Sequence, residues 1–115
     1  MNNLYLERLL ATEAKYTRGQ VNILRAYTES KRYGYEELVL TEIAWEEEWP
    51  DIIDLLRKAN FQTFLIADSS SALLETLHTF IEAGFSITGA KIVTKKDATE
   101  WDRPIKALEI KVNKR

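Results

Sequence analysis

The sequence predicts a mixed α/β fold in which one long N-terminal helix precedes a small, mostly parallel β-sheet. Two observations predict it: an apolar spacing of three and four residues over residues 3–30, and four apolar, β-rich runs farther along, the first three separated by helical stretches. The expected order is α-β-α-β-α-β-β, with right-handed crossovers and one antiparallel edge strand. We expect a single domain over residues 1–115, with a helical segment over 1–34 and an α/β core over 35–115.

Residues 3–30 are predicted to form one continuous helix, because the apolar stripe has charged residues between its members. Gly19 is the weak point, since a glycine inside a helix costs about 1 kcal/mol relative to alanine. Basic residues in the last turn and Gly34 just beyond it end the helix. The stripe consists of Leu6, Leu10, Ala14, Thr17, Val21, Leu24 and Thr28.

The length of this helix predicts a homodimer. A helix over residues 3–30 is about 42 Å long, whereas a compact chain of this size has a radius of gyration of about 13 Å. Part of the stripe would then overhang the sheet, and the same stripe of a second copy would cover it across a two-fold axis. A turn at Gly19 is the competing interpretation, because it would cover the stripe within one chain.

The next elements alternate between strand and helix. Residues 38–44 and 61–67 have the apolar, β-rich composition of strands, and the second run is apolar enough for a strand buried on both faces. Between them, Pro50 suits the first turn of a helix and Asn60 ends it.

The last third of the chain begins with a helix over residues 70–83, which Gly84 caps. Residues 85–95 alternate as a strand whose apolar phase slips at Gly89, and this slip predicts a bulge or a bend. After a loop, residues 105–112 alternate cleanly, which favours an antiparallel edge strand. The predicted inner face of the helix consists of Leu73, Leu74, Leu77, Phe80 and Ile81.

Composition excludes several classes of function. The absence of cysteine excludes disulfides, thiolate metal sites and a cysteine nucleophile. A net charge of −2 gives the chain no overall attraction to nucleic acid or to an anionic membrane. The N-terminus carries Glu7 and Arg8 and has no uninterrupted apolar core, so we expect neither a signal peptide nor a membrane span. We expect a cytoplasmic protein with no membrane partner and no cofactor.

Four polar residues mark one candidate site: Asp68, Ser69, Ser70 and Ser71 follow the second predicted strand, where ligands bind in α/β sheets. Backbone N–H groups and hydroxyls at such a turn can hold an anion. However, the glycines and the lysine of a phosphate loop are missing, and the carboxylate repels anions. Helix capping needs only one such side chain and is the favoured interpretation. The sequence contains no G-x-S-x-G elbow, the motif that would indicate a nucleophilic serine.

The corresponding turn after the first predicted strand is acidic and aromatic. Glutamates 46–48 lie between Trp45 and Trp49. They could attract a cation or mark a recognition surface, since tryptophan is enriched in binding hot spots. The favoured interpretation is a solvated loop whose tryptophans pack down on either side.

Two further groups are weaker candidates. His78 is the only histidine, and its pairing with Glu82 is too small a constellation for a metal site, so we expect no metal. Lys31 and Arg32 stand among three tyrosines, a mixture that can bind single-stranded nucleic acid. The acidic net charge argues against a nucleic-acid partner.

The run from Phe64 to Phe85 contains a strand, Asp-Ser-Ser-Ser, a helix with a Leu-His dipeptide, and Glu-Ala-Gly-Phe. It resembles a family of small uncharacterised domains in Gram-positive bacteria and their phages, over residues 38–95. The resemblance implies no activity and transfers no catalytic residues. It implies a phage or prophage origin. Small accessory proteins that act by binding are common in phages and prophages.

Three functional hypotheses follow, in order. The chain lacks a convergent set of catalytic residue types, so we expect a non-enzymatic accessory or interaction protein. The second hypothesis is a small-molecule or anion binder that uses residues 68–71 with the loop from Trp45 to Trp49. The third is a weak nucleic-acid binder that uses Lys31 and Arg32.

Overall fold

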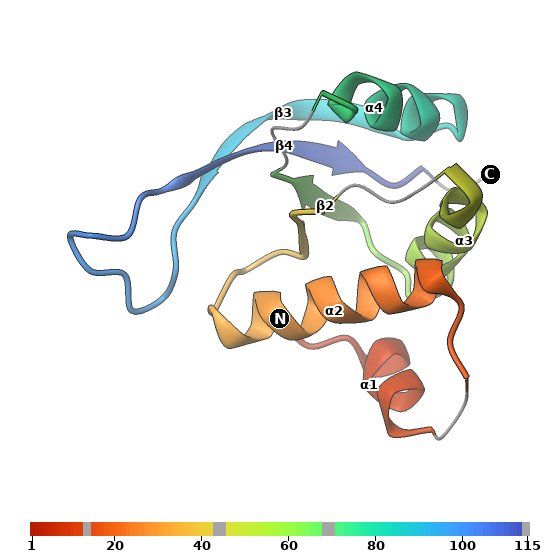
Figure 1. Ribbon diagram of the computed structural model, residues 1–115, viewed down its shortest axis with the longest axis horizontal. Coiled ribbons are helices and arrows are strands. Elements are labelled where there is room, and N and C mark those ends of the chain that lie inside the picture. The colour runs from red at the N-terminus through yellow and green to blue at the C-terminus, as the bar shows by residue number, and fades with distance from the viewer. Residues whose placement is uncertain (13–14, 43–45, 68–70, 114–115) are drawn as a thin grey trace.

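The computed structural model describes residues 1–12, 15–42, 46–67 and 71–113, and it is a mixed α/β structure, as predicted (Figure 1). Two N-terminal helices precede a region in which strands and helices alternate, and a β-hairpin follows. The elements are α1 (Leu4–Ala11), α2 (Arg18–Arg32), β1 (Val39–Leu40), the short 3₁₀ helix η1 (Glu46–Glu48), α3 (Trp49–Lys58), β2 (Thr63–Ile66), α4 (Leu73–Glu82), β3 (Ser86–Val93) and β4 (Ile105–Lys111).

The N-terminal segment forms two helices, so the prediction of one long helix over residues 3–30 is wrong. Thr17 has an extended backbone and is the N-cap of α2. Its hydroxyl oxygen accepts a hydrogen bond from the backbone N–H of Gln20 at 3.2 Å, and the Gln20 side-chain oxygen accepts one from the Thr17 N–H at 3.0 Å. This capping box pairs N–H groups that a helix start leaves unsatisfied. The break therefore lies at Thr17, whereas the competing interpretation placed a turn at Gly19, two residues later.

Helix α1 folds back against α2. Leu6 is fully buried, and the backbone N–H of Asn3 donates to the hydroxyl oxygen of Tyr27 at 2.9 Å. That hydroxyl donates in turn to the Glu7 carboxylate at 2.7 Å. Part of the apolar stripe is thus covered within the chain, which removes the overhang on which a helix-to-helix homodimer was predicted. The homodimer itself stays a prediction.

The sheet is mixed, and the prediction of a mostly parallel sheet is wrong. Its strand order is β1-β2-β4-β3, with β1 parallel to β2 and β4 antiparallel to both of its neighbours. The connection through α4 places β3 one strand position beyond β2, and β4 fills the gap. The predicted edge strand is therefore internal, and β3 forms the edge. Ala107 and Ile110 of β4 are buried on opposite faces, so both faces of this strand are covered.

The helices pack on one face of the sheet. Their buried side chains form a single cluster with the strands, in which Phe80 of α4 meets Phe64 of β2 edge to face at 5.2 Å between ring centroids. The opposite face carries a smaller cluster, to which no described helix residue contributes. Its buried members are Tyr35, Val39, Leu65, Val93 and Ala107.

Local backbone signals are placed as predicted. Asn60 ends α3 with a φ of 59°, and Gly34 and Gly84 follow α2 and α4 with φ values of 72° and 96°. The register of β3 against β4 shifts between Ile87 and Gly89, which confirms the predicted bulge. None of the described helices is long and apolar enough to cross a membrane.

Helix α4 has a narrower inner face than predicted. Leu77 and Phe80 are buried, but Leu74 is 79% exposed and Ile81 is also exposed. The prediction is wrong for these two residues. Because α4 packs beside the edge strand, only the stripe that faces Phe64 is covered.

Candidate functional site

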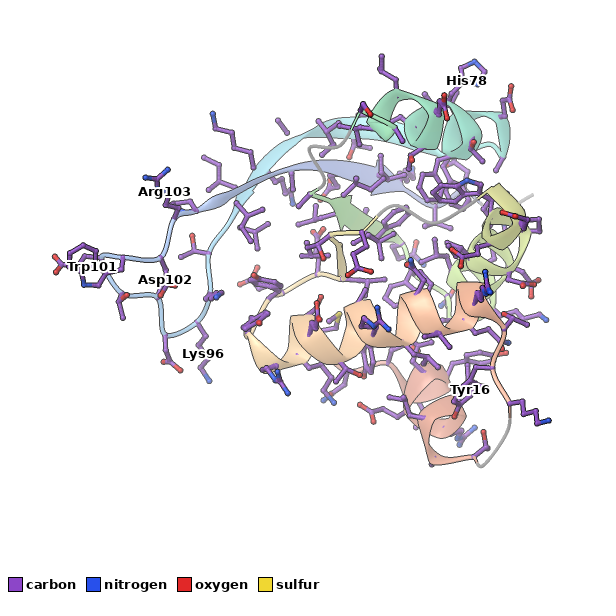
Figure 2. The ribbon with its side chains drawn as sticks, in the orientation of Figure 1. Tyr16, His78, Lys96, Trp101, Asp102 and Arg103 are labelled. Atoms are coloured by element: carbon purple, nitrogen blue, oxygen red, sulfur yellow. The ribbon has the colours of Figure 1, made fainter. Side chains whose placement is uncertain are left out.

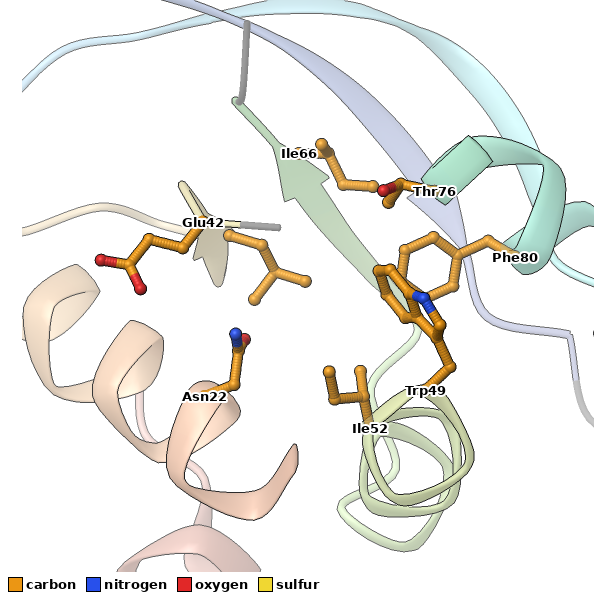
Figure 3. A pocket seen from close by; sticks show the side chains of 8 residues that line it. Asn22, Glu42, Trp49, Ile52, Ile66, Thr76 and Phe80 are labelled. Atoms are coloured by element: carbon orange, nitrogen blue, oxygen red, sulfur yellow. The ribbon is translucent and has the colours of Figure 1, made fainter. Parts of the chain in front are cut away.

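A narrow pocket lies beyond the carboxyl ends of the parallel strands β1 and β2 (Figure 3). Ligands of α/β sheets bind at this position, because the chain leaves the sheet there and helices begin. The empty volume is about 250 Å³, including the mouth. Strand ends and helices α2, α3 and α4 supply the lining residues Asn22, Leu40, Glu42, Trp49, Ile52, Ile66, Thr76 and Phe80.

Aromatic rings and polar groups lie on opposite sides of this pocket. The rings of Trp49 and Phe80 meet edge to face, with 5.2 Å between their centroids, and Asn22 and Glu42 lie across from them (Figure 3). The Thr76 hydroxyl donates to the carbonyl oxygen of Ala72, one helical turn earlier, at 3.1 Å. The interior has room for about one water molecule. A larger ligand therefore requires the lining side chains to move.

The structure brings one predicted site residue into this pocket. Trp49 begins α3 and packs on Phe80, consistent with the expectation that it packs down. Ser71 is exposed and precedes Ala72, the N-cap of α4, so Ser71 does not occupy the cap position. The other predicted residues of this site lie outside the described part of the chain: Asp68, Ser69, Ser70 and Trp45.

The two basic residues proposed for nucleic acid lie in different environments. Lys31 forms an ion pair with Glu7 of α1, and its ammonium lies 5.3 Å from the centroid of the Tyr27 ring. The hydrogen bond to Glu7 raises the pKa of Lys31, and the hydrogen bond to Lys31 lowers the pKa of Glu7. Lys31 thus joins α1 to α2, and the next residue, Arg32, is exposed on α2 as Lys31 is.

His78 lies on the exposed side of α4. Its Nδ1 atom is 3.2 Å from a carboxylate oxygen of Glu82, and both side chains are largely exposed. Within the described ranges, no group of three or more histidines and acidic residues could hold a metal ion.

A wider groove, which we call the α1–α2 groove, lies between α1 and the outer side of α2. Its open volume is about 710 Å³. Leu10 and Val21 are exposed in it, whereas the Tyr16 hydroxyl donates to the carbonyl oxygen of Leu9 at 2.5 Å at the end of α1. Sequence reasoning found the apolar stripe but not this groove, which requires α1 to fold back. The lining residues are Leu10, Tyr16, Val21, Leu24, Arg25, Thr28, Glu29 and Arg32.

A second surface feature is the hairpin arm, residues 91–107, which extends beyond the end of β2 (Figure 1). Trp101 lies at its tip and is 85% exposed (Figure 2). The backbone N–H of Lys96 donates to the carbonyl oxygen of Tyr33 at 2.8 Å, and this bond ties the arm to the end of α2. The Asp102 carboxylate accepts from the backbone N–H of Thr99 at 2.9 Å, which closes the tip and lowers the pKa of Asp102.

Sequence reasoning treated this arm only as a loop. The available signal was Trp101 between Glu100 and Asp102, in a stretch with no other apolar residue large enough to cover an indole ring. A tryptophan in such surroundings lacks local partners and stays exposed unless the rest of the fold covers it.

The open face of the sheet carries a cluster of three charged residues. The Lys91 ammonium lies 2.6 Å from a carboxylate oxygen of Glu109 and 3.3 Å from one of Glu37. Burial raises the pKa of Glu37, whereas hydrogen bonds from Lys91 and Thr88 lower the pKa of Glu109. The second oxygen of Glu37 is buried without a hydrogen-bond partner. The cluster therefore holds one carboxylate in an unfavourable environment.

Comparison with known proteins gives a family and no activity. The family described as "Domain of unknown function (DUF7698)" matches residues 22–112. Neither the curated proteins nor the solved structures include a match to the chain. The matched range begins within α2 and includes the whole sheet, the pocket and the hairpin arm, and it leaves out α1.

Proposed function

The chain belongs to the DUF7698 family, and because that family's description names no activity, we propose from the surface of the molecule that it is a non-enzymatic accessory protein of the cytoplasm that acts by binding another protein. The observation that carries the proposal is the 85% exposure of Trp101 at the tip of the hairpin arm. The resemblance to domains of Gram-positive bacteria and their phages supports a phage or prophage origin as part of this proposal.

Trp101 is suited to binding because a partner can bury its exposed apolar surface. An aromatic side chain of this size buries about 150–250 Å², which corresponds to about 4–6 kcal/mol at 25 cal/mol per Å² before the costs of association. Hydrogen bonds also fix the backbone that carries the ring, since the bond between Lys96 and Tyr33 ties the arm to the end of α2 and Asp102 closes the tip. Little backbone entropy is then lost on binding.

The proposal is tested by retention of host proteins on the immobilised chain. We expect Trp101→Ala to abolish retention of a specific protein and to leave the circular dichroism spectrum unchanged, because an exposed ring contributes little to the fold of the chain. Leu74→Ala on α4 is the matched control, since Leu74 is a comparably exposed apolar residue outside the arm. Equal retention by wild type and Trp101→Ala contradicts the proposal.

A small-molecule or anion binder is the second candidate, at the turn of residues 68–71 with the loop from Trp45 to Trp49. The position of Trp49 in the pocket beyond β1 and β2 favours it. A ligand at one hundred times its Kd stabilises the fold by about 2.7 kcal/mol. The resulting rise in melting temperature should be lost in Asn22→Ala, at the mouth, and kept in the exposed control Asn2→Ala. A ligand that stabilises both variants equally binds elsewhere.

Weak nucleic-acid binding through Lys31 and Arg32 is the third candidate. It predicts an affinity that falls steeply as the salt concentration rises. Because Lys31 is paired with Glu7, Arg32→Ala should weaken such binding more than Lys31→Ala does. Equal affinity at low and high salt contradicts this candidate.

A further inference from the structure

We infer that the hairpin arm of one copy of the chain binds in the α1–α2 groove of a second copy, and that the second copy returns the same contact, so that the protein forms a closed two-fold dimer. This inference rests on the proposed function of the arm as a binding element and names its partner. It places Trp101 of each copy against Leu10 and Val21 of the other.

The groove and the tip of the arm match in polarity. Leu10 and Val21 give the groove an exposed apolar surface, and Leu24 and Tyr16 extend it inward. Trp101 offers the complementary single apolar side chain, at a tip where no other large apolar residue competes for the contact. The groove, whose open volume is about 710 Å³, has room for this ring.

The two surfaces also match in charge. The tip, residues 97–102, contains Asp97, Glu100 and Asp102, and Lys95, Lys96 and Arg103 flank it. The Asp102 carboxylate lies 3.9 Å from the Lys95 ammonium, so Asp97 and Glu100 are the acidic residues that meet the partner. Arg25, Arg32 and Glu29 are the charged lining residues of the groove. Arg25 is paired with Glu42 at 3.5 Å, so Arg32 is the arginine that meets the acidic tip. An arginine beside the seated indole can stack on its face while it pairs with a neighbouring carboxylate. Charge complementarity of this kind fixes the orientation of a partner.

The arm cannot fill the groove of its own chain. The hydrogen bond from Lys96 to Tyr33 ties the arm to the end of α2, and the tip of the arm points away from the helices. Trp101 and Tyr16, which lines the groove, lie at opposite ends of the long axis of the molecule, which measures 39 Å (Figure 2). The six peptide units from Trp101 to Ala107 span up to about 20 Å, enough to reach into a neighbouring molecule.

Reciprocal exchange favours a closed pair over a single contact. In a two-fold dimer each chain donates one arm and one groove, so both contacts are satisfied within the pair. Once the first arm is bound, the second contact forms within one assembly at a high effective concentration. The exposed apolar residues of the groove and the arm are then covered together.

The first experiment measures mass against concentration by analytical ultracentrifugation. We expect a dimer at tens of micromolar, with the dimer Kd at least tenfold weaker in Trp101→Ala and in Val21→Glu. Circular dichroism confirms that each variant is folded. Leu74→Glu is the control, because it places a charge at an exposed apolar residue outside both surfaces, and it should dimerise as wild type does.

The second experiment tests the pairing of arm and groove directly. Val21→Glu keeps its arm and Trp101→Ala keeps its groove, so mixing them should form one contact and shift the emission of Trp101 to shorter wavelength. Adding the Trp101→Ala/Val21→Glu double variant instead should give no shift. In a charge exchange, Arg32→Glu should weaken the dimer and Glu100→Arg in the same chain should restore it.

Several results overturn the inference. They are a wild-type monomer at tens of micromolar, a dimer that Trp101→Ala or Val21→Glu leaves intact, and a mass that keeps rising with concentration as in an open chain of copies. None of these results contradicts the proposed function, because retention of a different host protein through Trp101 does not depend on self-association.

Discussion

Gly19 tests how closely α2 and α3 approach each other. A Cβ atom added at this position would lie 2.7 Å from the Cβ of Asp51 and 2.7 Å from the carbonyl oxygen of Glu48. Both distances are shorter than real Cβ contacts, and the carbonyl belongs to the backbone, which cannot rotate away as a side chain can. Gly19→Ala therefore requires the start of α2 to shift against the start of α3.

Two opposing effects decide the magnitude. Alanine gains up to about 1 kcal/mol over glycine from helix propensity, and less within the first turn. Overpacking of a close contact costs about 1–3 kcal/mol. We expect a net loss of about 1–2 kcal/mol of unfolding free energy, or about 4–8 °C in melting temperature for a chain of this size.

Urea unfolding at constant temperature measures the effect. Gly89→Ala is the control, because a Cβ added there meets nothing within 4 Å, and its unfolding free energy should stay within about 0.5 kcal/mol of wild type. A continuous helix over residues 3–30 predicts the opposite sign, since Gly19 would then be an ordinary interior glycine. Gly19→Ala with stability equal to or above wild type would therefore refute the packing of α2 on α3.

Three further variants test local features. Thr17→Ala removes the capping box of α2 and should cost about 1 kcal/mol in urea unfolding, most of it regained in Thr17→Ser. Gly34→Ala combines a φ of 72° with a Cβ only 2.5 Å from that of Lys96, so it should cost about 1–3 kcal/mol and speed hydrogen exchange at the Lys96 N–H. Burial raises the pKa of Glu37, so its contribution to stability is present below the unfolded pKa and is lost as the pH rises through the folded pKa. Glu37→Gln should therefore melt above wild type at about pH 7.5 and lose this advantage at about pH 4, whereas the exposed control Glu36→Gln should show no such trend.

Elements fixed by short stretches of sequence were predictable. Pro50 and Asn60 bound α3 because each residue has its own backbone preference, and neither depends on distant contacts. Gly84 ends α4 and the slip at Gly89 marks the bulge for the same kind of reason. These signals act through φ and through hydrogen bonds to near neighbours.

The break between α1 and α2 was also local but was masked by a stronger pattern. Thr17 fits the apolar stripe by spacing, so its role as an N-cap with Gln20 was overlooked. The stripe continues through the break because both helices use it to cover the same core. A capping box in the middle of a periodic stretch is evidence for a helix boundary, even where the periodicity continues.

The strand order depends on contacts far apart in sequence. Alternation in β4 predicts a strand but does not say whether one or two neighbours pair with it. The pairing of β4 with β2 on one side and with β3 on the other gives it two neighbours, and only the assembled sheet shows this pairing. The candidate site divides in the same way: its position beyond the strand ends was predictable, whereas the pairing of Trp49 with Phe80 and the α1–α2 groove required the helices to be placed.

The fold of α1 onto α2 determines which residues can act in association. In a continuous helix, Leu6 and Leu24 would both belong to an exposed stripe. In the structure they are 0% and 5% exposed, so a charge at Leu24 should unfold the chain and cannot serve as a test of dimerisation. Leu10 and Val21 of the same stripe remain exposed, in the groove between the two helices. The break that removes the helix-to-helix contact thus creates the concave surface to which we assign the arm, and Val21→Glu is the variant that separates loss of association from loss of fold.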